Sequence, residues 1–274
     1  MMDFKSSIHL LQACVKNIGS QLDEPEQRAL RRWWKEEKRS SSRLYRELLA
    51  LPCLDAERAI ESHPAHRHRW YHQLASEVSI EEFAAFLLEN WAFPAFLPLV
   101  ERTLAAQITD AGRTAMLRNI EDERLPIPHA DLMRRLFQGV KAKAGSDIPL
   151  QSYPSLIDRT LVFYYGYYCD PWHLVGSLYA TEAMGTHRMM HMGRGLTRLG
   201  IEPEDLEFIR IHLQCDDDHA RDWYDGVIAP SIQRNVALRA PIAEGIASCL
   251  ESSVRYLDDL SRRADERRLK AAPQ

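Results

Sequence analysis

The chain has 274 residues, and its 35 Lys and Arg side chains against 39 Asp and Glu give a formal net charge of −4. Charged residues make up 27% and hydrophobic residues 45%, which is the balance of a globular protein able to bury a full core. A mildly acidic chain lacks the basic face on which most nucleic-acid binding depends. The composition therefore argues against a DNA- or RNA-binding protein.

The sequence also argues against a membrane or secreted protein. The richest apolar run, residues 83–100, is interrupted by Glu89, Asn90, Pro94 and Pro98, so no membrane span fits it. The first residues lack the apolar core and small-residue cleavage site of a signal peptide. Five widely spaced cysteines, without a CxxC pair, are typical of free thiols in a reducing compartment. We expect a cytoplasmic protein.

Helical signals open the chain. Asp23 followed by Pro25 predicts the start of a helix over residues 26–38, and Ser79 with Glu82 reads as a capping box for another. Apolar residues recur at helical rather than alternating spacing, and the start and stop signals divide the chain into about nine or ten helices. No segment of the N-terminal half alternates as a strand would.

The second half continues the helical pattern. Asp170 caps a helix with Pro171 at its first position, and this helix is expected to end at Gly200. Further prolines mark the starts of the next two helices and a kink in the last one, at Pro203, Pro230 and Pro241. The one hairpin-like pair, Asp225-Gly226, follows residues that keep the helical pattern. The sequence therefore predicts an all-α fold.

The helices are expected to form one compact unit with additions at both ends. No linker rich in Gly, Ser or Pro divides the chain, and no sequence repeat occurs. We predict a helical domain over residues 56–262. Residues 1–55 would be two amphipathic helices added to its outside, and the charged residues 263–274 would form a frayed tail.

The segment from His212 to His219 carries the clearest chemical pattern. His212, Asp216 and His219 are spaced i, i+4 and i+7, so on a helix their side chains lie within about 60° of one another. Two imidazoles and a carboxylate on one face are half of a site for iron, manganese or zinc. The alternative is a solvated acidic helix with incidental histidines, which is what we expect of the neighbouring Asp217 and Asp218.

A second candidate is the corner between two predicted helices. Glu123 would end one helix and His129 would begin the next, so that a carboxylate and an imidazole could meet. Acidic clusters at helix ends are usually solvated, which is the alternative here. The short, proline-rich gap between the two residues also leaves Glu121 as a rival ligand.

Glu182 is the third candidate, because its neighbours are small or apolar. A buried carboxylate is either neutral or bound to something, and a metal ion would satisfy it. His187 and His191 lie on the same predicted helix at i, i+4 spacing, but they are rotated away from Glu182 by about 140° and more. We interpret them as a partly exposed face or a substrate-contacting rim, and the histidines between residues 63 and 72 as a surface cluster.

Together these residues form a set of three carboxylates and three imidazoles. Two divalent metal ions could each take three protein ligands from the set, which leaves positions open for dioxygen and substrate. Helical bundles commonly build dinuclear iron or manganese centres from carboxylate and histidine ligands on facing helices.

The order of these residues resembles that of the haem-oxygenase-like diiron oxidases and oxygenases. The match is an early Glu and His, a lone Glu, and then His-x-x-x-Asp-x-x-His. The resemblance implies a bundle of about seven core helices with an N-terminal extension. It implies two Fe²⁺ ions, with manganese as the alternative metal, and dioxygen as co-substrate. The ligands that it implies are Glu123, His129, Glu182, His212, Asp216 and His219.

The resemblance also implies a function. The expected enzyme oxidises a small amine- or amino-acid-like metabolite by N-oxygenation, oxidative C–C cleavage or desaturation, in specialised metabolism. An external electron donor and a homodimer are expected with it, and Arg188 or Arg194 would hold a substrate carboxylate. The alternatives are a metal-free helical binding or scaffold protein and a cofactor-less oxidase of the same fold.

Overall fold

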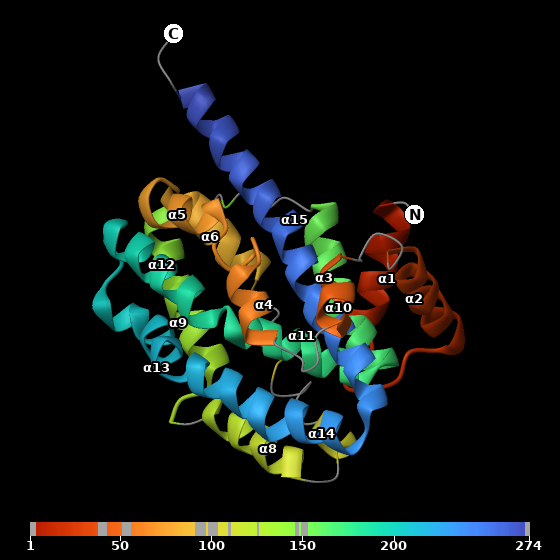
Figure 1. Cartoon of the computed structure of the whole chain (residues 1–274). Coiled ribbons are helices and arrows are strands. Elements are labelled where there is room, and N and C mark those ends of the chain that lie inside the picture. The colour runs from red at the N-terminus through yellow and green to blue at the C-terminus, as the bar shows by residue number, and fades with distance from the viewer. Residues whose placement is uncertain are drawn as a thin grey trace.

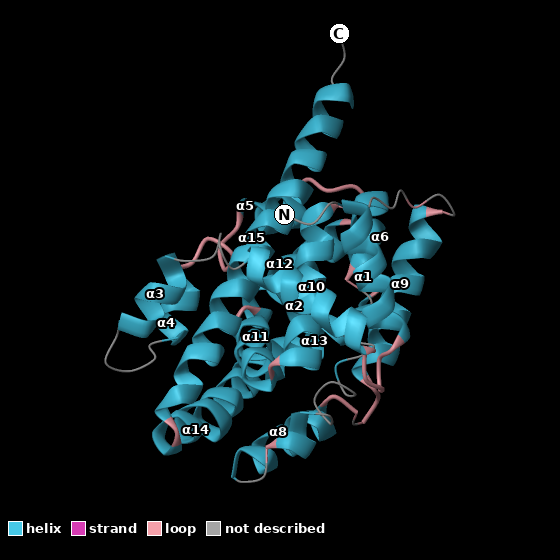
Figure 2. Ribbon diagram, turned by 90° about the vertical axis from the view of Figure 1, so that its right-hand side faces the viewer, coloured by secondary structure: helices cyan, strands magenta, loops and turns pink. Residues whose placement is uncertain are grey.

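The computed structural model describes residues 4–37, 43–50, 56–90, 97, 104–108, 111–124, 126–145, 148 and 153–271. These residues form 14 α-helices and a few shorter helical turns, with no strand among them (Figures 1 and 2). The predicted all-α class is confirmed. In the part of the chain that is described, no helix has both the length and the apolar character that crossing a membrane requires.

The helices follow one another closely. Those of the first half are α1 (Phe4–Lys16), α2 (Glu24–Glu37), α3 (Arg43–Ala50), α4 (Ala56–Ser62), α5 (Arg69–Ser76), α6 (Ile80–Glu89), α8 (Ala111–Asp122) and α9 (His129–Ala144). Those of the second half are α10 (Pro154–Cys169), α11 (Pro171–Ala183), α12 (Gly185–Arg198), α13 (Glu207–Arg221), α14 (Ala229–Arg234) and α15 (Arg239–Ala271). A 3₁₀ turn, Pro203–Leu206, precedes α13, and a π-helical turn, Asp222–Ile228, follows it.

Local capping explains several of the helix starts. Ser79 and Glu82 form a complete capping box at α6. The Asp170 carboxylate accepts hydrogen bonds from the backbone N–H groups of Trp172 and His173 at α11. These side chains satisfy backbone donors that a helix leaves unpaired in its first turn.

Several of the predicted helix features are wrong. The described residues hold 14 α-helices rather than nine or ten, and three of them, rather than two, lie before residue 55. The helix that begins at Pro171 ends at Ala183 rather than Gly200, and α12 begins at Gly185. At this break α13 comes so close that a Cβ on Gly185 would overlap the Asp216 carboxylate. Pro241 lies in the first turn of α15, where no helical hydrogen bond needs its missing N–H, so it introduces no break.

The long helix α15 runs through the molecule and packs against α11, α10, α5 and α3 (Figure 1). At the crossing with α11 the two backbones touch. A Cβ on Gly176 would overlap the carbonyl oxygen of Ile242, and one on Gly245 would overlap that of His173. Glycine at both positions therefore sets the distance between the two helices.

The N-terminal helices α1 and α2 pack on α10, on the right in Figure 1, around a separate hydrophobic cluster that includes Leu30, Trp33 and Leu161. Trp34 stacks on Tyr165 with 4.3 Å between the ring centroids. At the other end of the chain, α15 is helical as far as Ala271 and projects beyond the other helices in both views. The division at residues 55 and 262 stays a prediction.

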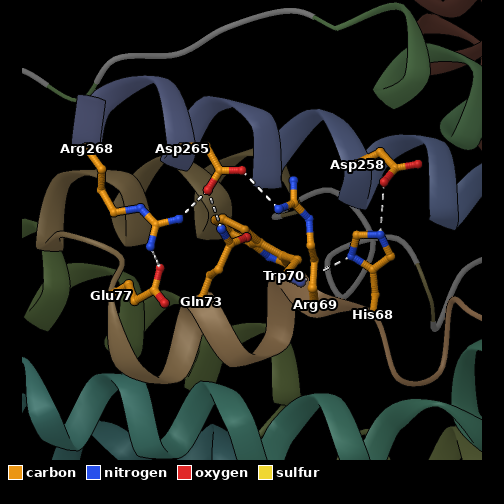
Figure 3. A network of polar contacts seen from close by, with 8 residues as sticks. All are labelled: His68, Arg69, Trp70, Gln73, Glu77, Asp258, Asp265 and Arg268. Carbon is orange, nitrogen blue, oxygen red and sulfur yellow. Dashed lines mark hydrogen bonds and ion pairs between the residues drawn. The ribbon is translucent and has the colours of Figure 1, made fainter. Parts of the chain in front are cut away.

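A polar network fastens α5 to the C-terminal part of α15 (Figure 3). His68 caps α5 through its Nδ1, and its Nε2 lies 3.2 Å from the Asp258 carboxylate. Asp265 pairs with Arg69 at 3.0 Å and accepts a hydrogen bond from Gln73 at 2.9 Å. Arg268 joins Asp265 to Glu77 at the end of α5. These contacts extend along α15 to Arg268, close to the end of the helix at Ala271.

The opposite side of α5 packs on α12. A Cβ on Gly195 would overlap the carbonyl oxygen of Leu74, so the two helices are in backbone contact. Along this interface four histidines form a chain of ring contacts, with successive centroids 4.9, 4.7 and 4.9 Å apart, in the order His66, His187, His191 and His72. The histidines near residue 70 are therefore partly an interface, not simply a surface cluster.

The glycine crossing predicts a specific loss of stability. Gly176→Ala should destabilise the fold by about 2 kcal/mol, because the new methyl group meets a backbone carbonyl that cannot move aside. Urea unfolding followed by circular dichroism would measure the loss. The matched control is Gly112→Ala in α8, where the nearest atoms lie at an ordinary 3.4 Å. Equal stabilities for the two variants would contradict the close crossing.

The histidine chain predicts a pH dependence of stability. Burial, followed by His191 and His66, lowers the pKa of His187 from 6.5 to about 4. The unfolded chain therefore binds more protons at this position between pH 6.5 and 4, and stability is lost as pH falls through that window. The urea concentration at the midpoint of unfolding should fall less between pH 7.5 and pH 5 in His187→Gln than in the wild type. Replacement of the exposed His9 in α1 should leave the wild-type slope, and a shared slope in all three proteins would refute the prediction.

Candidate metal centre

Four elements bring the six predicted ligands together in the interior. Glu123 follows the last turn of α8, His129 begins α9, Glu182 lies near the end of α11, and α13 supplies the other three. All six are buried, and none is more than 8% exposed. Ionisable side chains seldom gather in a protein interior without a partner or a cation. The structure places the set together, and the ligand role of each member stays a prediction.

The corner between α8 and α9 sets the first pair. The backbone N–H of His129 donates to the carbonyl of Glu123 at 3.0 Å, and its Nδ1 lies 3.0 Å from the Glu123 Oε2. Glu121 is exposed on the outer side of α8. Because only one of the two carboxylates faces the interior, the geometry favours Glu123 over its rival.

Helical periodicity sets the α13 residues. His212, Asp216 and His219 are buried, whereas Asp217 and Asp218 between them are exposed. Spacing by i, i+4 and i+7 accounts for this separation, as the sequence predicted. The helix therefore presents one buried stripe to the site and an acidic face to solvent.

The ligand atoms fall into two groups of three. Glu123, His129 and His212 place one such atom each within 4.8 Å of the others, and Cys215, Asp216 and His219 do the same. Glu182 adjoins the second group, with its Oε2 3.8 Å from the Nδ1 of His219. Sequence reasoning missed Cys215, although its i+3 spacing from His212 puts it on the same stripe.

His212 is held in one tautomer. Its Nδ1 lies 2.7 Å from the carbonyl oxygen of Phe208, which can only accept, so Nδ1 carries the proton. Burial and the neighbouring His129 lower the pKa of His212 to about 3. The neutral ring therefore has its Nε2 lone pair available. A histidine oriented by a backbone carbonyl in this way is the usual form of a metal ligand.

The carboxylates of the cluster are only partly compensated by the positive groups near them in the described structure. Burial, followed by the Glu182 charge, raises the pKa of Asp216 to about 8. Burial opposes protonation of His219, but the surrounding carboxylates, Glu182 first, outweigh it and raise the pKa of that imidazole to about 9. The site thus favours positive charge, which a divalent cation would supply.

Several buried polar atoms of the cluster also lack a hydrogen bond of good geometry within the described part of the protein, although some lie close to a charged neighbour. They are Oδ2 of Asp216, Nδ1 of His129 and both ring nitrogens of His219. An Asp122 carboxylate oxygen lies 3.5 Å from the His219 Nε2, which leaves Nδ1 directed toward Glu182. Oxygen and imidazole donors with open valences fit iron or manganese.

A cavity of about 70 Å³ adjoins the cluster. Glu123, Glu182, His212 and Asp216 line one side of it. The remaining wall is mostly apolar, and its side chains include Phe86, Leu87, Met133, Met189, Met192 and Phe208. Ligand pockets in proteins commonly combine apolar walls with a few converging polar groups.

The other candidates lie elsewhere. His187 and His191 face α5 and make the ring contacts described above, so neither reaches this cluster. Arg194 is exposed, whereas Arg188 lines the cavity. Arg159 of α10 also lines the cavity, and sequence reasoning did not single it out. Its signal was a basic residue, next to Asp158, within the otherwise mostly apolar stretch LIDRTLVFYYG.

Comparison with known proteins gives a family and a fold. The sequence model of a family described as iron-containing redox enzymes matches residues 83–254, a range that holds all six residues. Two crystal structures of a CADD-like protein of unknown function from Nostoc punctiforme share the fold, with TM-scores of 0.59 and 0.61. They are 15% and 16% identical to this chain and cover 84% and 80% of it, and 98% of their own chain is covered. No curated protein matches the sequence.

The geometry predicts which replacements lower iron content. His219→Ala and Glu182→Gln should each lose iron, measured by mass spectrometry on protein from iron-supplemented cells, while far-ultraviolet circular dichroism stays helical. His191→Ala is the matched control, because His191 and His219 are both 3% exposed and only the latter lies in the cluster. Loss of iron in the control alone, or in none of the variants, would show that the cluster is not the metal site.

Proposed function

The chain belongs to the iron-containing redox enzyme family, and we propose that it is a dinuclear iron enzyme that uses dioxygen to oxidise a small metabolite. The observation that carries the proposal is the pair of adjoining donor groups, three ligand atoms in each, beside one buried cavity. A single iron would need only one of the groups.

The assignment of ligands keeps the first group and replaces Cys215 with Glu182 in the second. Glu123, His129 and His212 would hold one iron, and Glu182, Asp216 and His219 would hold the other. Cys215 would lie beside the second iron, but burial and the Asp216 charge raise the pKa of its thiol, which disfavours the thiolate that iron binds. The three carboxylates offset most of the four positive charges of two Fe(II) ions.

The metals would supply the electrons that dioxygen requires, and an external donor would restore them. The protein's own contribution is positioning and exclusion of water. The Phe208 carbonyl orients the His212 ring, and the Asp122 carboxylate faces the outer nitrogen of His219. The apolar side chains of the cavity keep bulk water from the reacting centre.

The substrate proposal follows from the size and position of the cavity. A cavity of this volume suits a small molecule rather than a polymer. We assign the substrate to the amine- and amino-acid-like metabolites, oxidised by N-oxygenation, C–C cleavage or desaturation, in specialised metabolism. Manganese is the alternative metal.

Titration of the metal-free protein with Fe(II) under anaerobic conditions tests the proposal. Two Fe(II) ions should bind per chain, and mixing with oxygenated buffer should consume dioxygen at an oxygen electrode. Glu123→Ala should suppress the uptake, because it removes a carboxylate from one iron. Glu121→Ala should retain it, because that side chain faces solvent two residues away.

Three outcomes would contradict the proposal. The first is that Glu121→Ala, but not Glu123→Ala, suppresses the uptake of dioxygen, which would assign the ligand role to Glu121. The second is preferential loading with zinc and no uptake of dioxygen with any amine or amino acid. The third is a folded wild-type protein that binds no metal, which would support the scaffold alternative.

A further inference from the structure

Two guanidinium groups line the cavity beside the proposed ligands, and neither forms a contact ion pair with a carboxylate of the described structure. The charge of Arg188 in α12 acts on the Asp216 carboxylate, but no side-chain hydrogen bond or contact ion pair holds its guanidinium within the described structure. Arg159 of α10 donates only to the side-chain oxygen of Asn90, at 2.8 Å. We propose that these two arginines form a carboxylate-binding subsite, and that the substrate is a carboxylic acid with an apolar body. The oxidation of that acid rests on the proposed function, but its binding does not.

The two arginines act on the same space. Both line the main cavity, and both also line a smaller one of about 20 Å³ beside Tyr71 and Tyr256. Burial raises the pKa of the Tyr71 hydroxyl and the Cys249 thiol, and both arginines counter that rise at both groups. Their charges therefore converge on one region rather than on opposite walls.

A buried network holds Arg159 from behind. The Asn90 amide that accepts from Arg159 also donates to the Tyr256 hydroxyl at 3.1 Å, and this hydroxyl donates to Glu89 at 2.8 Å. Glu89 pairs with Arg263 at 3.2 Å, and the two side chains are 3% and 7% exposed. A buried ion pair adds little net stability over apolar packing, so a positioning role accounts for it better.

The network also leaves Arg159 with unused donors. Its guanidinium lies 5.3 Å from the centroid of the Tyr256 ring, and its Nε is buried without a hydrogen bond to any described residue. A guanidinium offers five N–H donors in a planar fork that matches a carboxylate. One amide oxygen therefore leaves most of these donors available.

Arg188 is placed by the face of α12. Gly185, Arg188, Met189 and Met192 are spaced i, i+3, i+4 and i+7, which puts them on one side of the helix. The last three line the cavity, and Gly185 adjoins Asp216. Arg188 thus lies between the proposed metal ligands and the apolar wall, while the exposed Arg194 lies on another face.

The charges of the cavity set the chemistry of the ligand. The carboxylates that line it are the three assigned to the metals, so a substrate ammonium group has no free anionic partner there. Two guanidinium groups select an anion, and the phenylalanine, leucine and methionine side chains select an apolar body. Within the proposed metabolites, this narrows the substrate to those that carry a carboxylate.

Isothermal titration of the purified protein with hexanoate tests the subsite, with metal content measured on each sample. Hexanoate should bind to the wild type, and hexanamide and hexylamine should bind at least tenfold more weakly because they carry no anion. Arg159→Gln and Arg188→Gln should each weaken hexanoate binding at least tenfold, and the Lys variants should restore part of it. Arg194→Gln, on the same helix as Arg188, should bind as the wild type does.

The outcomes separate this inference from the proposed function. Hexanoate binding with the expected arginine dependence in protein that binds no metal would support the subsite and contradict the diiron proposal. Absence of hexanoate binding, equal binding of hexanamide, or equal binding by the Gln variants would overturn the subsite whatever the metal content. Loss of metal in Arg188→Gln with unchanged hexanoate affinity would also overturn it, because the arginine would then serve the ligands alone.

Discussion

The structure is organised around three carboxylates that share one apolar interior. Glu123, Glu182 and Asp216 are removed from water, and the proximity of Glu182 together with burial raises the pKa of Asp216 to about 8. Such a cluster needs protons, arginines or metal cations to balance it. The helices around it both create that need, by excluding water, and fix the donor atoms that a cation would use.

The bundle meets this constraint through a few close helix contacts. Glycine at the crossing of α11 and α15 lets the two backbones touch, and α11 carries Glu182 to the cluster. Gly185 then gives Asp216 room at the start of α12. One face of α12 packs its histidines on α5, and the other carries Arg188 into the cavity. The same elements that hold the fold together therefore aim the charged groups.

Local signals predicted the fold class and part of the site. Capping residues such as Ser79 and Asp170 mark helix starts because they act within three residues. Helical spacing likewise separates buried Asp216 from exposed Asp217. The end of α11 was not predictable in this way, because Gly185 is needed for contact with another helix. The position of Arg159 in the cavity could not be predicted for the same reason, because its partner Asn90 is 69 residues away in sequence.

The charge balance of the cavity also connects the binding of the proposed metal ions to that of the proposed carboxylate substrate. Without metals, two guanidinium groups and three carboxylates share the cavity, so the carboxylates would weaken, but not abolish, the binding of a further anion. Two Fe(II) ions would add four positive charges and reverse the sign of the site. The bound metals would then attract an anionic substrate. The metals would increase the affinity for the substrate, and the substrate would increase the affinity for the metals. A protein built this way would bind its carboxylate substrate without metals, and would bind it more tightly when the metals that oxidise it are present.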